Sequence, residues 1–319
     1  MKHKTFLPDN KLRPYIQYYW TVNDDGENHL QLSMADGFTC IRFFRGGKQS
    51  FVRNISIDTT SINNVEWKFN VKNNDIQTVS SGILGPRIAS YALISHNKIE
   101  TIGVKFTILG AQRIFGEKLC SLSNKFTNLS DIKDDGLNTL ENSIMNAPSL
   151  QKCLSYMDKY FLSFFTYDDR KQNSYIMAEK ILSSNITSAK LAELADVACC
   201  SVRNLNRIID SYTGLTPKQI IRIARLSTTI KKMVDGAHLE HIDLKGMALE
   251  CGFYDLSHMT KEMKALCGYT PLQCISFFRN NLGSNNLWTH QQGETIIWGK
   301  IQDSSFRWCV NAHEQHLTL

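Results

Sequence analysis

The sequence predicts a two-domain α+β protein, with a β-barrel and accompanying helices in the first half and an all-α domain in the second. Residues 1–130 contain short aromatic and β-branched runs separated by Gly and Asn turns, a pattern typical of strands. Residues 170–281 place apolar side chains at spacings of three and four, as amphipathic helices do. Within that second part, one helical pattern occurs twice, about 54 residues apart.

Length and composition are those of an ordinary globular protein. The 319 residues suffice for about two domains, and 42% of them are apolar and 21% charged. The net charge of +6 is unevenly distributed, because residues 170–281 hold 15 Lys and Arg against 10 Asp and Glu. A basic excess of this size is compatible with nucleic-acid binding, although many solvated helices show it too.

Several locations and chemistries are disfavoured by the sequence. It has no apolar run of membrane-spanning length, and Met1–Asn10 lacks the apolar core of a secretory signal. The nine cysteines are irregularly spaced without a C-x-x-C pair, which favours buried thiols over a zinc or redox site. We therefore expect a cytoplasmic protein with no membrane partner, no metal and no other cofactor.

The first 130 residues are expected to form a barrel or sandwich of short strands. A barrel of this size can enclose one small ligand. Arg42, Arg45 and Arg87 have two interpretations, a structural role, which we favour, and contact with an anionic effector. The candidate strands are Tyr15–Val22, Thr39–Phe44, Ser50–Ile57, Val65–Val71, Gln77–Ser80 and Ile99–Thr107.

Catalysis is not indicated by any motif in this half. A metal-dependent barrel enzyme needs ligands converging on one ion, and only His3, His29 and His96 are present, without an H-x-H pair. There is no Ser/His/Asp order, Gly-rich phosphate loop or supported carboxylate pair. We therefore expect no enzymatic activity and no catalytic residues. A cysteine-based alkyl-repair enzyme fused to a DNA-binding module would need clustered zinc cysteines, which the sequence lacks.

Helices are expected between residues 108 and 168. The candidates are Leu109–Phe115, Asp134–Met145 and Pro148–Phe165. The apolar stripes of the last two have two interpretations, a homodimer face or packing on the barrel. The polar stretch 166–173 is the expected linker, which places a sensor or dimerisation domain at 1–168 and a second domain at 169–281.

The second domain begins with a predicted helix-turn-helix unit. After a scaffold helix at Tyr175–Leu182, Thr187 is expected to cap a helix that buries Leu191, Leu194 and Ala195. Ser201 caps the next helix, Val202–Tyr212, and Gly214 ends it. Its inward face is expected to hold Val202, Leu205, Ile209 and Tyr212, and its outward face Arg203, Asn206, Arg207 and Asp210.

A second unit follows after a long helix. Thr216-Pro217 starts this connector, which runs to about Val234 and is roughly 27 Å long. Asp243 and Asp255 are expected to cap the two helices of the unit, with Cys251-Gly252-Phe253 as the turn between them. In the last of these helices, Met259, Met263 and Leu266 point inward, and Ser257, His258, Lys261 and Lys264 point outward.

The two units end in matching sequences, Gly214-Leu215-Thr216-Pro217 and Gly268-Tyr269-Thr270-Pro271. A rigid connector between them can set two reading helices about one duplex turn apart, roughly 34 Å, on one face of DNA. Arg suits guanine and Asn suits adenine in a major groove. The repeat therefore predicts a protein that binds double-stranded DNA.

These residues resemble the DNA-binding domain of the AraC/XylS regulators. The resemblance covers roughly 100 of the 319 residues, and Met259 and Met263 stand where the family favours Phe. It implies DNA contacts in two successive grooves by Arg203, Asn204, Asn206, Arg207, Leu256, Ser257, His258 and Lys261. The matching residues are Leu191-Ala192, Ser201, Leu205, Arg207, the two Gly-x-Thr-Pro sequences, Arg225-Leu226, Ala248, Gly252-Phe253, Ser257-His258 and Lys264.

The first half is similar to one branch of the same regulators. The similarity implies a cupin-like sensor domain without naming its effector. It rests on Leu12-Arg13-Pro14-Tyr15, Tyr19-Trp20, Asp36-Gly37, Gly85-Pro86-Arg87, Gly103-Val104-Lys105-Phe106 and Gly110-Ala111.

The stretch 282–319 extends beyond the usual end of the family. Ile296–Ile301 and Phe306–Val310 are candidate strands, so we expect this tail to fold back as a β-hairpin on the protein body.

The sequence thus predicts a DNA-binding transcription regulator whose activity changes with a small-molecule effector or with homodimerisation through the first domain. The alternative is an effector-independent regulator whose first domain only dimerises or contacts RNA polymerase.

Overall fold

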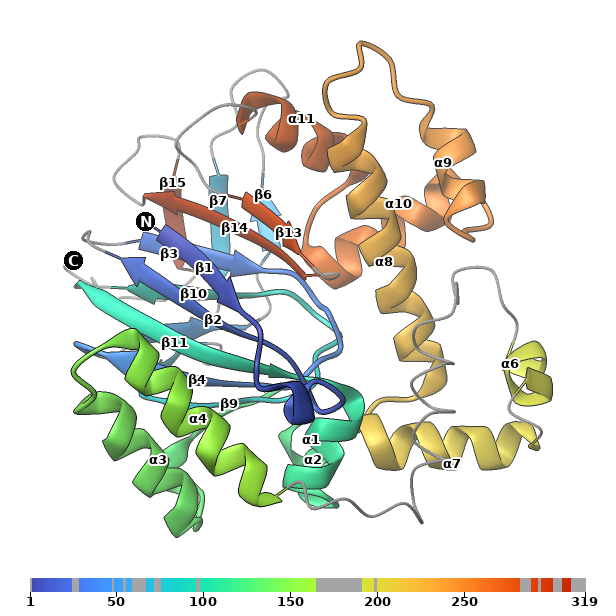
Figure 1. The fold of residues 1–319 in the computed structure, drawn as a ribbon. Coiled ribbons are helices and arrows are strands. Elements are labelled where there is room, and N and C mark those ends of the chain that lie inside the picture. The colour runs from blue at the N-terminus through green and yellow to red at the C-terminus, as the bar shows by residue number, and fades with distance from the viewer. Residues whose placement is uncertain are drawn as a thin grey trace.

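A computed structural model describes most of the chain. The described residues are 2–24, 29–47, 49–53, 56–58, 67–71, 76–95, 98–164, 191–197, 200–281, 288–291, 294–300 and 306–310. They form a β-rich first domain and an all-α second domain (Figure 1). The scaffold helix expected at 175–182, the Thr187 cap and the linker at 166–173 lie outside the described residues. No helix among the described ones is long and apolar enough to span a membrane.

The first sheet has six antiparallel strands. One face is covered by helices and the other faces the second sheet, so that β11 is buried almost throughout. The register of β11 against β2 shifts between Lys105 and Phe106. In spatial order the strands are β1 (Lys2–Phe6), β2 (Ile16–Asp24), β11 (Ile99–Phe106), β4 (Cys40–Arg45), β9 (Gly82–Leu84) and β12 (Phe126–Asn128).

The second sheet also has six strands, two of which come from the tail. Its order is β13 (Trp288–Gln291), β14 (Glu294–Lys300), β3 (His29–Ser33), β10 (Tyr91–Ser95), β5 (Gln49–Val52) and β8 (Ile76–Val79). β13 and β14 form an antiparallel hairpin, and β14 continues the sheet along β3. A small third sheet pairs β15 (Phe306–Val310) in parallel with β7 (Trp67–Val71), which pairs with β6 (Ser56–Asp58).

The two-domain α+β architecture is as expected, but the first domain is a sandwich in the part of the chain that is described. No described ladder joins the two six-stranded sheets into a closed barrel. Aromatic side chains fill the space between the sheets, and Phe51 of β5 contacts both Tyr91 of β10 and Phe126 of β12. Two sheets that bury each other's inner faces in this way form a stable sandwich, without hydrogen bonds that close them into a barrel.

Several strand boundaries differ from expectation for local reasons. β11 ends at Phe106 because the Thr107 side chain accepts a hydrogen bond from Gly110 and caps α1 (Ile108–Phe115). The expected strand Ser50–Ile57 is divided between β5 and β6. β10 was not expected, because both of its faces are buried and its sequence therefore lacks an alternating pattern.

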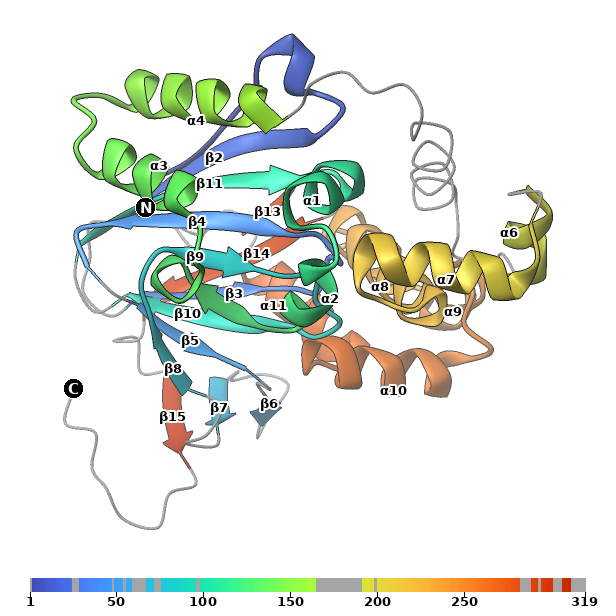
Figure 2. The ribbon, with the colours of Figure 1, turned by 90° about the horizontal axis from the view of Figure 1, so that it is seen from below.

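The helices α3 (Asp135–Met145) and α4 (Leu150–Phe164) cover the outer face of the first sheet (Figure 2). Their apolar side chains join the sheet in one cluster that includes Leu140, Ile144, Met157 and Phe161. The packing interpretation therefore accounts for these apolar stripes. The other described helical segments of the domain are η1 (Asn10–Leu12), α2 (Lys118–Leu122) and η3 (Leu129–Asp131).

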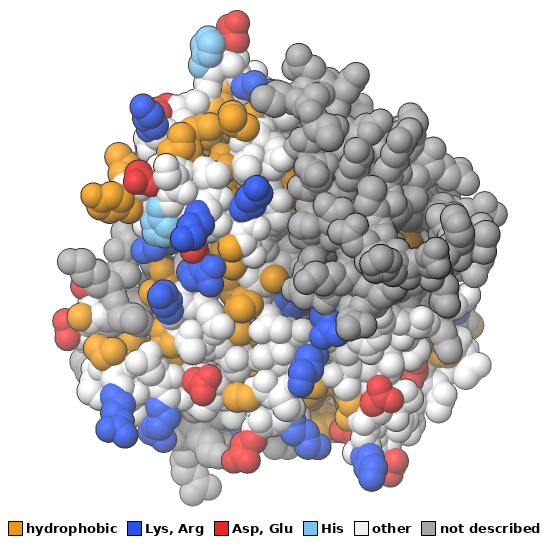
Figure 3. All heavy atoms as spheres, turned by 180° about the vertical axis from the view of Figure 1, so that it is seen from behind, with side chains coloured by type: hydrophobic (Ala, Val, Ile, Leu, Met, Phe, Trp, Pro, Cys, Tyr) orange, Lys and Arg blue, Asp and Glu red, His pale blue; other side chains and the backbone are white. Residues whose placement is uncertain are grey.

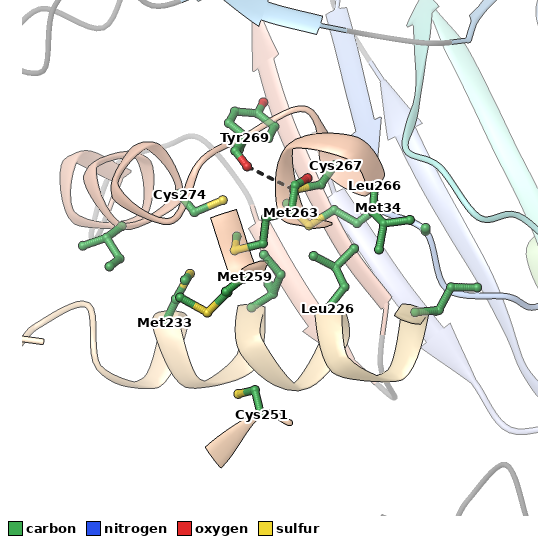
Figure 4. Packing of buried hydrophobic residues seen from close by; sticks show 14 of the residues in the cluster. Met34, Leu226, Met233, Cys251, Met259, Met263, Leu266, Cys267, Tyr269 and Cys274 are labelled. Atoms are coloured by element: carbon green, nitrogen blue, oxygen red, sulfur yellow. Dashed lines mark hydrogen bonds between the residues drawn. The ribbon is translucent and has the colours of Figure 1, made fainter. Parts of the chain in front are cut away.

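The second domain is built on the long helix α8 (Pro217–Asp235). Leu226 and Met233 of α8 pack with Met259 and Met263 of α10 (Figure 4). Met34 and Ala35 of the first domain belong to the same cluster, so the two domains share one core. The other described helices are α6 (Leu191–Val197), α7 (Val202–Thr213), α9 (Leu244–Glu250), α10 (Leu256–Cys267) and α11 (Pro271–Asn281).

Candidate nucleic-acid interface

Helix α7 presents a polar face to solvent. Ser201 caps it by accepting a hydrogen bond from the Asn204 amide at 3.2 Å. Leu205 and Ile209 are buried, whereas Arg203, Asn206 and Arg207 are exposed. Val202 was expected to point inward but is 39% exposed, because it is the first residue of the helix and lies one turn before the buried Leu205.

Arg207 is oriented by its own helix. Its guanidinium Nη2 donates a hydrogen bond to Asn204 Oδ1 over 3.1 Å. This i,i+3 contact occupies one of the five guanidinium donors and leaves the rest of the fork toward solvent. Asn204 thus positions Arg207 on the exposed face of α7.

Helix α10 has a similar design. Asp255 caps it by accepting from the His258 amide at 2.7 Å. Met259 and Met263 are fully buried, whereas Ser257 and Lys261 are exposed. Leu256 is half-buried and packs against the domain core, so only part of its side chain faces outward.

His258 has a defined orientation at the start of α10. Its Nδ1 accepts a hydrogen bond from the Tyr254 amide at 3.2 Å. Its ring meets Phe253 edge to face, with ring centroids 5.6 Å apart. Because Nδ1 is an acceptor, a neutral imidazole carries its proton on Nε2. His258 therefore supports the turn on one side and offers a donor on the other.

The connector α8 is tied to the second unit by ion pairs. Arg222 Nε on α8 contacts Glu262 Oε2 on α10 at 2.5 Å, and Lys232 pairs with Glu250 of α9. Arg279 of α11 donates to the carbonyl oxygens of Ala237, Leu239 and Glu240, which holds the loop after α8. The pairing with Arg222 turns Glu262 toward α8, so this acid is held beside the connector.

Helix α7 lies at the N-terminal end of the connector α8. In Figure 1, α7 lies at the lower end of α8 and α9 at the upper end. Thr216 caps α8 through a capping box with Gln219, and Gly214 takes the left-handed conformation that ends α7. Figure 3 shows Lys and Arg side chains gathered over the second domain, on the left of that view.

The contact between α7 and the first domain was not expected from the sequence. Ser123, which follows α2, donates its hydroxyl to the Gly214 carbonyl at 2.8 Å. The Cys120 thiol lies 3.6 Å from the Asp210 carbonyl. These are main-chain acceptors, so no side-chain pattern in either segment could have indicated them.

The interior of the first domain is unusually basic. Arg42 is 1% exposed, and it contacts the hydroxyl of Tyr91 and lies over the ring of Trp20. Arg87 is 3% exposed and pairs with Asp36 at 3.2 Å. Arg45, by contrast, pairs with Glu100 at 3.0 Å near the surface and has a structural role. Among the described residues, no group of three His, Cys, Asp or Glu could hold a metal ion.

Two family models match the chain. Residues 194–275 match a helix-turn-helix domain, and residues 4–128 match a domain of unknown function (DUF6597). No curated protein matches.

Solved structures of ToxT from Vibrio cholerae are similar to the chain. One, from O395, is 12% identical with a TM-score of 0.42 and covers 83% of this chain and 99% of its own. A second, described as bound to (E)-4-(8-methylnaphthalen-1-yl)but-3-enoic acid, is 13% identical with a TM-score of 0.39, covering 82% and 99%. A third, from strain SCE256 and described as bound to an unsaturated fatty acid, is 14% identical with a TM-score of 0.35, covering 78% and 95%.

The capped helices and the match to a helix-turn-helix domain define the chain as a DNA-binding transcription regulator. The helix-turn-helix domain at residues 194–275 is of the AraC type.

Proposed function

We propose that the regulator binds a bipartite DNA site through α7 and α10. The observation that supports this is that each helix is capped at its start, buried on one face and polar on the other. The 19 residues of α8 between them span about 28 Å, close to one turn of duplex. Such a connector suits two helices that enter successive major grooves on one face of DNA.

The first helix provides direct base contacts in this proposal. Arg203, Asn206 and Arg207 reach base edges, with Arg suited to guanine and Asn to adenine. Asn204 acts mainly by holding Arg207, to which it is hydrogen-bonded. Preorganisation by that bond reduces the side-chain entropy that Arg207 loses on binding.

The second helix provides a mixture of base and backbone contacts. Ser257 and His258 Nε2 donate to base or phosphate acceptors near the start of α10, and the exposed part of Leu256 reaches a thymine methyl group. Lys261 lies one turn further along, where a flexible ammonium suits a phosphate.

The first domain, residues 1–168, is proposed to control this binding in the cytoplasm through an effector or through homodimerisation. In the alternative, this domain senses nothing and only dimerises or contacts RNA polymerase. Residues 169–281 form the DNA-binding domain, and the tail 282–319 completes the second sheet through β13 and β14.

Selection of sites from a random DNA library by the full chain tests the DNA-binding proposal. We expect a bipartite motif, and Arg207→Ala should cost about 1–3 kcal/mol on it and relax one base position. Lys152→Ala, an exposed basic residue of α4, is the matched control and should keep the motif. An unchanged base preference in Arg207→Ala contradicts the assignment.

A further inference from the structure

The first domain contacts the C-terminal end of each of the two proposed DNA-reading helices. On α7, the Ser123 hydroxyl donates at 2.8 Å to the carbonyl oxygen of Gly214, the residue that ends the helix. On α10, the amide and the hydroxyl of Ser90 both donate to the carbonyl oxygen of Leu266, at 2.9 and 3.2 Å. Carbonyl groups at the end of a helix have no partner within it, so the first domain provides partners for both helices at corresponding ends.

These contacts are distant from the residues that are proposed to contact DNA. Arg207 precedes Gly214 by seven residues and Ser257 precedes Leu266 by nine. Along a helix these separations are about 10 and 14 Å. In a helix-turn-helix unit the N-terminal part of the second helix contacts the bases. The first domain can therefore keep its contacts while both helices enter their grooves.

The two first-domain segments that make these contacts, 85–90 and 120–125, are joined by Asn124. Its amide donates to the Pro86 carbonyl at 2.8 Å, and its side-chain Oδ1 accepts from the Ile88 amide at 2.9 Å. Asn124 has a φ of +57°, a conformation that asparagine tolerates better than most residues. Asn124 therefore links the segment that contacts α7 to the segment that contacts α10.

The two segments are also closely packed on each other. A Cβ at Gly85 would lie 2.0 Å from the carbonyl oxygen of Leu122, and the Gly85 amide donates to the Lys125 carbonyl at 3.1 Å. Ile88 packs on the apolar cluster that the two domains share. The segments thus form one continuous support between the ends of α7 and α10.

This support is a second connection between α7 and α10, in addition to α8. The first connection runs from Gly214 through α8 to the Arg222–Glu262 pair on α10. A helix fixes the distance between its own ends, but not the direction of helices that are attached to it through turns. Two connections that close a ring restrict that direction, which preorganises the two helices for binding.

We infer that the first domain sets the spacing and relative direction of the two DNA-reading helices, with Asn124 as the positioning residue of this support. The protein then accepts one separation of its two half-sites and rejects sites with one base pair more or fewer. One base pair changes the separation by about 3.4 Å and the rotation by about 35°. The inference rests on the proposed bipartite DNA binding and adds a specificity for spacing that neither reading helix provides alone.

DNA binding at different spacings tests this inference. The two half-sites selected by the full chain are placed at the selected spacing, and at one base pair more and one fewer. We expect the unchanged chain to prefer the selected spacing about tenfold, because linked units gain affinity only where both can bind at once. Asn124→Gly keeps the positive φ without strain but loses the acceptor for the Ile88 amide, and it should lower the preference to about threefold or less.

Two variants separate positioning from stability. Asn124→Asp keeps an acceptor and should retain the spacing preference. Asn128 Oδ1 accepts from the Ser80 amide at 3.0 Å, a bond of the same kind outside the two segments. Asn128→Ala should therefore lower the melting temperature and keep the spacing preference. Ser123→Ala loses the bond to Gly214 and replaces Asn124→Gly in the test if that variant folds poorly.

The outcomes are distinct. An unchanged spacing preference in Asn124→Gly, or an equal loss of affinity at all three spacings, overturns the inference. Equal binding of the unchanged chain at the three spacings overturns it as well. Failure of the DNA-binding proposal is distinguishable, because it appears at the selected spacing as an unaffected base preference in Arg207→Ala.

Discussion

The hydroxyl of Ser123 donates a hydrogen bond to the carbonyl oxygen of Gly214 at 2.8 Å, and this contact joins the first domain to the end of α7. Gly214 adopts a φ of +65°, and a Cβ there would lie 2.4 Å from Ser123 Oγ and 3.1 Å from Cys120 Cα. A glycine is therefore required both by the helix end and by the neighbouring domain.

The first prediction follows from this contact. Gly214→Ala should lower the free energy of unfolding by about 2 kcal/mol or more, because it combines a left-handed alanine with a steric overlap. Urea denaturation of the full chain measures it. Gly47→Ala is the control, since a Cβ at Gly47 would meet nothing within 4 Å. Equal stability of Gly214→Ala and Gly47→Ala would contradict the close approach of Gly214 to Ser123 and Cys120.

The cap of α10 supports a second prediction. Asp255→Ala removes the acceptor that the His258 amide contacts at 2.7 Å and should cost about 1 kcal/mol of stability. It should also weaken DNA binding, because the same helix start positions Ser257 and His258. Asp255→Asn keeps an acceptor and should retain most of both properties. A loss in Asp255→Asn as large as in Asp255→Ala would argue against the capping role.

The tie between α8 and α10 gives a third prediction. Arg222 and Glu262 are 28% and 20% exposed, so solvent screens their pairing only in part. A double-mutant cycle with Arg222→Ala and Glu262→Ala should show a coupling of about 1 kcal/mol. The Lys232–Glu250 pair, whose side chains are 40% and 63% exposed, is the internal comparison and should show a smaller coupling. A larger coupling energy for Lys232–Glu250 than for Arg222–Glu262 would mean that burial does not determine the strength of these ion pairs.

Alkaline pH should destabilise the first domain through Tyr19. Its hydroxyl donates to Asp158 Oδ1 at 2.8 Å, and burial first, then the bond to Asp158, raises its pKa above the ordinary value of 10.0. A raised pKa means that the stabilisation is complete below pH 10 and is lost as pH rises above it. The measured free energy of unfolding should therefore fall above pH 10. In Tyr19→Phe, the dependence of that free energy on pH should be smaller by the equivalent of one proton. An unchanged slope would contradict this assignment.

The helices of the second domain could be predicted because their signals are local. Ser201, Thr216, Asp243 and Asp255 each accept a hydrogen bond from an amide two or three residues later, so a cap depends on a few adjacent residues. The burial of Val202 was predicted wrongly, because the helical period does not show which turn of the helix first reaches the core.

The contacts between distant segments could not be predicted in the same way. Gly37 has the sequence signature of a turn, and nothing in it indicates that α8 packs against it. Arg87 and Asp36 were noted in separate motifs, but their pairing across 51 residues depends on how the sheets stack. The tail strand β14 was expected, whereas its partner β3 was not, because strand pairing at long range leaves no local pattern.

The central claim is that α7 and α10 enter two successive major grooves. Guanine N7 methylation protection on the selected DNA site tests it most directly. We predict two protected regions about 10 base pairs apart on one face of the duplex, the first lost in Arg207→Ala and the second weakened in Lys261→Ala. A single protected region, or equal loss of both regions in each variant, would contradict it.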